Sequence, residues 1–307
     1  MGAPSGDQFE IAGAGYRAVV TECGATLRVL EHEGRPLVHG FDEDQMASAG
    51  RGQLLVPWPN RIRDGAYSFD GRNLQLGLTE PELGNASHGL VRWAAWTPEE
   101  QAASSVSLSY RLMAQSGYPW TLDLHVLFDL SADGLTVTQT ATNLSDQPAP
   151  YASGAHPYLS AGPGPVDRWE LSLPASLRLL SDARQIPVGE EDLTGTTYDF
   201  RVSRPIRDAV LDDGFGDLDR DADGVATAVV RDPQTGRGTA LWVDRHHPWL
   251  MVFSADKGWD TPRAALAVEP MTAPPDAFRT GRDLLTLAPA GQPGDEVSVS
   301  WGIRAVE

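Results

Sequence analysis

Val106-Ser-Leu-Ser-Tyr-Arg-Leu112 alternates apolar or aromatic residues with polar ones, and the same period of two returns in Leu122-Asp-Leu-His-Val126 and Leu135-Thr-Val-Thr-Gln-Thr-Ala141. Successive side chains of a β-strand point to opposite faces of the sheet, so this pattern is typical of antiparallel strands with one buried face. The middle of the chain therefore predicts an antiparallel sheet.

Further strands are expected on both sides of this region. The dipeptides Asp70-Gly71 and Asp133-Gly134 indicate tight turns between neighbouring strands. The apolar runs that extend the pattern are residues 169–173, 226–230, 250–253 and 297–303. The sequence thus predicts an all-β fold with little helix, limited to a short turn within residues 182–194 or 276–284.

The number of strands also favours a particular architecture. One open sheet of this size would expose a whole face and two edges, so a large sandwich of two sheets is expected. The 31 glycines and 23 prolines fall between the apolar runs and form no linker. We therefore expect one domain over residues 1–307.

The charge balance excludes several classes of partner. The sequence has 42 acidic and 24 basic residues and a formal net charge of −18. Proteins that bind nucleic acid or anionic membranes carry basic patches, so neither partner is expected. A small neutral ligand fits better, although a local cluster of arginines would still admit a phosphorylated one.

Cysteine content and hydropathy indicate the cellular compartment of the protein. Cys23 is the only cysteine, which excludes an internal disulfide and a multi-cysteine metal site. The first ten residues lack the pattern of a signal peptide, and no run approaches the roughly 18 apolar residues of a membrane span. We expect a soluble, cytoplasmic protein.

Two segments far apart in the chain each present one titratable side chain beside proline, namely Gly154-Ala-His-Pro-Tyr158 and Val268-Glu-Pro-Met-Thr272. Proline fixes its own φ and favours extended backbone before it, so His156 and Glu269 should lie on rigid backbone, as proton transfer requires. Each residue alone is more typical of a structural histidine or an edge charge. Together they suggest an acid and a base.

The segment from Gly52 to Gly65 combines prolines, an amide and two arginines and is too interrupted for a strand. Arginine offers five donors in a fixed fork, which suits hydroxyl or carboxylate groups, and Asn60 could donate and accept beside it. Arg61 is a candidate ligand-binding residue. For Arg63 a structural salt bridge is favoured.

His88 precedes Gly89, a residue that allows close approach of backbone to ligand, and Trp93 follows shortly after. An indole can stack on the apolar face of a sugar, so Trp93 is a candidate binding residue, whereas Trp96 is better explained as a core aromatic. Asp212 follows an apolar pair and is a candidate carboxylate for ligand hydroxyls.

Metal sites are not expected. Asp219, Asp221 and Asp223 alternate like the start of an EF-hand loop, but Val230 stands where the bidentate glutamate is required. Neither His88 nor His156 has the closely spaced second ligand of a zinc site.

These segments together resemble the aldose 1-epimerase family, the galactose mutarotase-like proteins. The resemblance covers nearly the whole chain. It runs in order through residues 59–61, 85–89, 155–158, 211–215 and 268–278. It implies a β-supersandwich of large antiparallel sheets and an enzyme that needs no cofactor and interconverts the α and β anomers of an aldose.

The resemblance also implies residue roles. Glu269 matches the general base that takes the proton from the C1 hydroxyl, and His156 matches the general acid that protonates the ring oxygen. Arg61, His88 and Asp212 match positions that hold the sugar.

Several alternatives stay open from the sequence. The loop Val56-Pro-Trp-Pro59 and the Pro-Met-Thr after Glu269 differ from galactose mutarotases, so galactose is not implied as the substrate. A hexose-6-phosphate 1-epimerase would use Arg63 or Arg92 for the phosphate. A carbohydrate-binding protein without turnover, and a glycoside hydrolase using Asp212 and Glu269, are further readings. The partner is expected to be a small sugar, and the protein a monomer or homodimer.

Overall fold

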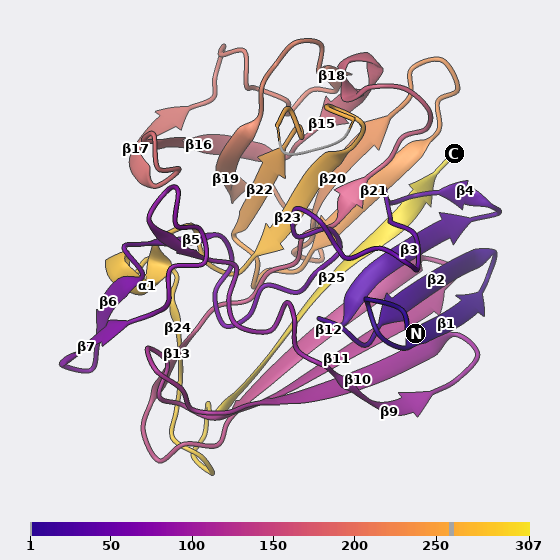
Figure 1. Ribbon diagram of the computed structural model, residues 1–307. Coiled ribbons are helices and arrows are strands. Elements are labelled where there is room, and N and C mark those ends of the chain that lie inside the picture. Colours follow the sequence, from indigo (N-terminus) through magenta and orange to yellow (C-terminus); the bar gives the residue numbers. More distant parts are fainter. Residues whose placement is uncertain (1, 258–260) are drawn as a thin grey trace.

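A nine-stranded antiparallel sheet forms one layer of the molecule in the computed structural model, which describes residues 2–257 and 261–307 (Figure 1). Its strands in spatial order are β18 (Arg204–Pro205), β15 (Glu170–Ser172), β20 (Ala226–Arg231), β21 (Gly238–Val243), β25 (Glu296–Val306), β12 (Gly134–Asn143), β11 (Leu122–Ser131), β10 (Ser105–Leu112) and β9 (Thr97–Gln101).

A six-stranded antiparallel sheet forms the second layer. Its order is β14 (Tyr158–Leu159), β23 (Leu266–Met271), β22 (Trp249–Phe253), β19 (Asp212–Leu218), β16 (Ala175–Ser181) and β17 (Pro187–Asp192). Strand β17 corrects the expectation of helix within residues 182–194. Its residues pair with β16 from Leu177↔Asp192 to Ser181↔Pro187, and that strand pairing is available only in the folded chain.

The remaining elements are smaller. They are a four-stranded sheet of β1 (Gln8–Gly13), β2 (Tyr16–Thr21), β3 (Thr26–His32) and β4 (Arg35–Pro36), the pairs β5 (Arg61–Arg63) with β8 (Asn85–Ser87), β6 (Ala66–Phe69) with β7 (Arg72–Gln75) and β13 (Ala149–Tyr151) with β24 (Leu285–Leu287), a 3₁₀ turn η1 (Val166–Arg168) and the helix α1 (Ala277–Thr280). The helix confirms the expected turn within residues 276–284.

The hairpins fall at the predicted turns. Asp70 and Gly71 both have positive φ, as a two-residue turn between twisted strands requires, and they join β6 to β7. Strands β11 and β12 pair as far as Ser131 opposite Gly134, so the tight turn between them includes the predicted Asp133. Buried and less buried residues alternate along β11, so the period-two pattern has its expected physical cause.

The main core lies between the two layers. Phe128 of β11, Phe215 of β19 and Val268 of β23 belong to the same buried apolar cluster. The all-β sandwich prediction is therefore confirmed. Within the described residues, no helix is long and apolar enough to cross a membrane.

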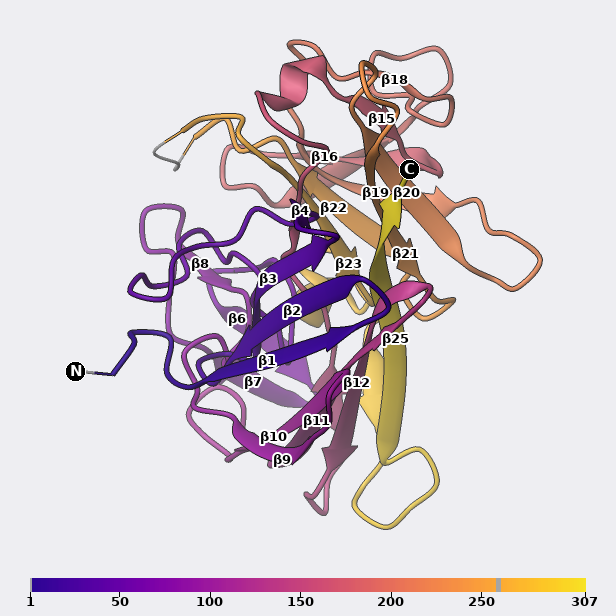
Figure 2. The same ribbon diagram turned by 90° about the vertical axis from the view of Figure 1, so that its right-hand side faces the viewer.

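The opposite face of the six-stranded sheet is covered by the N-terminal third of the chain. Figure 1 shows purple N-terminal chain passing in front of β23, and Figure 2 shows β8 on the side of β22 and β23 that faces away from β12 and β25. Because side chains alternate along β23, residue 269 points toward this cover while residue 268 points into the core. The candidate site lies between this sheet face and its cover.

Candidate active site

Three adjacent strands of the six-stranded sheet form the floor of a cavity. In the strand register Met251 of β22 lies opposite Glu269 of β23, and Phe253 lies opposite Asp212 of β19. All four residues line the same cavity. The carboxylates Asp212 and Glu269, which are 57 residues apart in sequence, are thus brought to one face by strand pairing.

Close backbone packing brings two loops and one strand together. A Cβ atom on Gly154 would lie 2.8 Å from Cβ of Pro59 and 2.9 Å from the Pro270 carbonyl oxygen, so only glycine fits there. Ala155 donates its N–H to the same carbonyl at 3.2 Å. The loop before Arg61, the loop before His156 and the strand bearing Glu269 therefore meet at one point.

The ring and the backbone of His156 are both closely packed. Its ring stacks on Tyr158 with the centroids 4.9 Å apart and the planes 13° apart. On Gly50 a Cβ would come within 2.7 Å of the His156 ring carbon Cδ2, so this glycine allows the backbone to approach the ring. The backbone N–H of His156 donates to Gln53, and its carbonyl accepts from Gly52.

His156 and Glu269 contact each other. Their Nε2 and Oε1 atoms are 3.3 Å apart, and the two residues are only 5% and 2% exposed. Burial disfavours the charged form of each group. Burial, helped by the charge of Arg92, lowers the pKa of His156 to about 3, while burial and then the charge of Asp212 raise the pKa of Glu269 well above its ordinary value.

The two arginines of β5 have different surroundings. Arg61 lines the cavity and forms a two-pronged ion pair with Glu80, with Nε–Oε2 at 2.8 Å and Nη2–Oε1 at 2.9 Å. Arg63 does not line it and instead pairs with Asp182 at 2.7 Å. Arg63 thus has the salt bridge expected of a structural residue and stands outside the cavity.

His88 and Asn60 are joined by backbone. The N–H of His88 donates to the Asn60 carbonyl at 2.8 Å. Both residues have positive φ, which is uncommon for residues other than glycine. The rings of His88 and His156 are 5.5 Å apart. Burial lowers the pKa of His88 well below its ordinary value, so its imidazole is neutral.

Unpartnered polar atoms gather in the cavity, which has a volume of about 320 Å³. Buried polar groups normally find a hydrogen-bond partner. Among the described residues, four buried atoms on the cavity wall have none: Asn60 Oδ1, His88 Nδ1, His156 Nδ1 and Glu269 Oε2. Such a set of donors and acceptors suits a ligand that carries several hydroxyl groups.

The other sequence candidates also reach this cavity. Asp212 lines it, and burial is the main cause that raises the pKa of its carboxyl to about 6, opposed by the charge of Arg61. Trp93 lies on the cavity wall with 53% of its surface exposed, whereas Trp96 is buried at 3%, as expected. All seven predicted site residues therefore line one cavity.

Some cavity residues were not singled out from the sequence. Glu80 and Lys257 contribute charge, and Met251 and Phe253 contribute apolar surface. Lys257 could have been noticed, because it is the only lysine in the 307-residue sequence. Within residues 2–257 and 261–307, no group of three or more His, Cys, Asp or Glu side chains is placed to hold a metal ion.

Comparison with known proteins gives a consistent result. The family model described as Aldose 1-epimerase matches residues 7–298. The Escherichia coli (strain K12) protein called Uncharacterized protein YihR is 33% identical over 290 residues, which span 94% of this chain and 91% of that protein. Uncharacterized protein YphB of the same organism is 27% identical, spanning 92% of this chain and 95% of that protein.

Solved structures share the fold. A GalM/aldose epimerase homologue from C. elegans superposes with a TM-score of 0.84 at 22% identity, covering 98% of this chain and 99% of the other. A galactose mutarotase-like protein from Clostridium acetobutylicum also gives 0.84, at 17% identity, with coverage of 96% and 94%. The galactose mutarotase-like architecture expected from the sequence is confirmed.

Proposed function

The chain belongs to the aldose 1-epimerase family, and we propose that it is a mutarotase that interconverts the α and β anomers of a free aldohexose or a related sugar. One observation carries this proposal. His156 and Glu269 contact each other inside a cavity whose remaining unpartnered atoms suit hydroxyl groups. A protein that only bound sugar would not need a buried acid and base in contact.

The reaction needs two coupled proton transfers. Glu269 removes the proton from the C1 hydroxyl, the C1–O5 bond breaks with its electron pair going to O5, and His156 delivers a proton to O5. C1 becomes an aldehyde carbon. Rotation about the C1–C2 bond then presents the other face, and the same transfers run in reverse to close the ring.

The buried pair is suited to this cycle because it holds one proton. The pKa directions favour a proton on Glu269 and a neutral His156 before a sugar binds. This is the distribution that follows ring opening. When a sugar binds, its C1 hydroxyl donates to Glu269 and its ring oxygen accepts from His156. These two hydrogen bonds favour an ionised Glu269 and a protonated His156, the distribution that ring opening requires. The 3.3 Å contact gives the proton a direct route between the two.

Arg61→Ala is expected to raise KM by about tenfold to a hundredfold, with a smaller effect on kcat, because a charge-assisted hydrogen bond to the sugar is lost. The check is the KM and kcat for mutarotation of the best substrate. Arg63→Ala, two residues away and outside the cavity, is the matched control and should leave both constants near wild type. Equal effects of the two variants would show that Arg61 acts only in the fold.

Asp212→Asn is expected to move the alkaline limb of the pH profile of kcat/KM to lower pH. The negative charge of Asp212 raises the pKa of Glu269, and the pair loses its only proton when pH rises through that pKa. Removing the charge lowers the pKa and brings the loss of activity to lower pH. Asp213→Asn, which alters a neighbouring carboxylate paired with Arg178, is the control. A limb that stays in place or moves upward would contradict this electrostatic coupling.

A specific observation supports a second candidate, an aldose with an anionic group such as a hexose 6-phosphate. The guanidinium of Arg92 lines the cavity with no hydrogen bond or ion pair to any described residue, and burial lowers its pKa. The lone lysine, Lys257, lines the same cavity. Neither cation has an ion pair with a residue in 2–257 or 261–307, and two such cations in a chain of net charge −18 are a suitable site for an anion.

On this second candidate, glucose 6-phosphate should be turned over with a higher kcat/KM than glucose at equal ionic strength. Arg92→Ala and Lys257→Ala should each lower kcat/KM for the phosphorylated sugar by about tenfold and change that for glucose little. The measurement is anomer exchange by NMR. Preference for glucose, with no selective loss in either variant, would leave the free aldose as the substrate.

A further inference from the structure

We propose that Glu80 is the positioning residue that sets the sugar-binding geometry of Arg61. The inference rests on the proposed function, since it assigns how the binding arginine of that site is held. Glu80 follows Thr79 in the loop between β7 and β8, and it was not a candidate from the sequence.

The ion pair with Arg61 uses one edge of the guanidinium. Nε and Nη2 donate to the two oxygens of Glu80, an arrangement that fixes both the place and the plane of the group. Nη1 has no hydrogen bond to any described residue. The Arg61–Glu80 ion pair therefore acts as a clamp. It leaves donors of Arg61 for a ligand while it restricts the conformational freedom of the long arginine side chain.

The carboxylate itself has little capacity left for sugar hydroxyls. Besides the two bonds from Arg61, Oε2 accepts a third from Asn85 Nδ2 at 3.2 Å. The side chains of Arg61 and Glu80 are only 15% and 26% exposed, so the pair is partly shielded from water. Burial opposes the charged form, but the bonds and the charge of Arg61, helped by the bond from Asn85 and the charge of Arg92, lower the pKa of Glu80 and favour a charged clamp.

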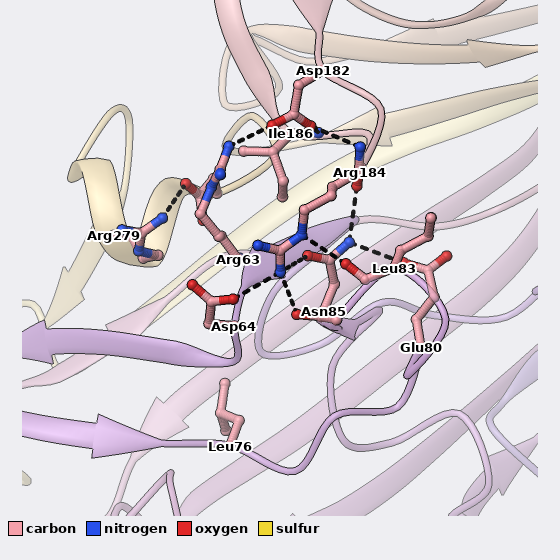
Figure 3. A network of polar contacts seen from close by, with 12 residues as sticks. Arg63, Asp64, Leu76, Glu80, Leu83, Asn85, Asp182, Arg184, Ile186 and Arg279 are labelled. Atoms are coloured by element: carbon pink, nitrogen blue, oxygen red, sulfur yellow. Dashed lines mark hydrogen bonds and ion pairs between the residues drawn. The ribbon is translucent and has the colours of Figure 1, made fainter.

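The clamp is anchored from behind by a second loop. Asn85 Nδ2 also donates to the Arg184 carbonyl at 2.9 Å, and the Arg184 guanidinium donates to the carbonyls of Leu83 and Gly84. Figure 3 shows Arg184 lying along Asn85, with Glu80 on the other side of the amide. The backbones of Glu80 and Asn85 exchange two hydrogen bonds, which close the loop between them.

Loss of the clamp should affect ligand binding more than chemistry. Glu80 touches neither His156 nor Glu269 in any described hydrogen bond or ion pair, so the proton transfers keep their partners. A released Arg61 must lose side-chain freedom again each time a sugar binds, at a cost of about 0.5–1.5 kcal/mol, or about twofold to tenfold in affinity.

The experiment measures sugar affinity in four proteins that all carry Glu269→Gln, so that turnover plays no part. They have Glu80→Ala, Arg61→Ala, both or neither, and the dissociation constant of the preferred sugar is determined by calorimetry. We expect Glu80→Ala to weaken binding by about twofold to tenfold when Arg61 is present and to have no effect in the Arg61→Ala background. Asp64→Asn removes a peripheral ion pair of Arg184 and should leave affinity unchanged.

Equal loss of affinity on Glu80→Ala in both backgrounds would overturn the proposal, because Glu80 would then act independently of Arg61. A crystal structure of the Glu80→Ala variant gives a second test that needs no sugar. Disorder or a new rotamer of Arg61 supports the clamp, and an Arg61 in the same place contradicts it. Absence of sugar binding in all four proteins would instead count against the proposed function, so the two failures are distinct.

Discussion

Glu269→Gln is expected to lower kcat for mutarotation by about 10²–10⁴-fold, the usual contribution of a positioned acid or base. The amide has nearly the shape of the carboxyl group but neither accepts nor releases the proton of the C1 hydroxyl. Because Glu269 is buried and favours its neutral form, the substitution replaces one uncharged group by another. The fold should therefore be retained, and a thermal unfolding curve checks this.

The matched control for this variant is Glu100→Gln, which changes an exposed glutamate of β9 outside the cavity. It should keep wild-type kcat and KM. Glu269→Gln with wild-type turnover would contradict the assignment of Glu269 as the base. Loss of turnover together with loss of the unfolding transition would show a defect in folding and would call for measurement of a milder variant, Glu269→Asp.

His156→Asn is expected to reduce kcat by a similar factor, because an amide cannot deliver a proton to the ring oxygen. The two residues act as one unit that holds a single proton. The double variant with Glu269→Gln should therefore be little slower than either single variant, rather than slower by the product of the two factors. The measurement is the rate of anomer exchange for the two single variants and the double variant.

His125→Asn serves as the control for this second variant. His125 lies on β11, is 42% exposed at its side chain and pairs with Glu99 away from the cavity. It should leave the rate unchanged. An His156→Asn protein that turns over at the wild-type rate would remove His156 from the mechanism, and effects that multiply in the double variant would show that the two residues act separately.

Much of this site could be predicted because its residues carry local signals. His156 and Glu269 stand beside prolines, His88 stands beside a glycine, and Asp212 follows an apolar pair. The strands were predictable for a related reason, because apolar and polar residues alternate along segments such as β11.

The clamp on Arg61 could not be predicted in the same way. Glu80 stands 19 residues from its partner, and their contact depends on the pairing of β5 with β8. The salt bridge expected for Arg63 could not be given a partner from the sequence. Asp182, which binds Arg63, comes from a loop more than a hundred residues away. Strand β17 was missed because none of its residues is buried, so its sequence lacks the apolar alternation of β11.

The most direct test of the account is polarimetry of freshly dissolved α-glucose and α-galactose, with wild-type protein and with Glu269→Gln as the control. The account predicts that the wild-type protein accelerates the change in optical rotation of at least one sugar and that the variant does not. Unchanged rates for both sugars and for glucose 6-phosphate would contradict the claim that this cavity catalyses mutarotation.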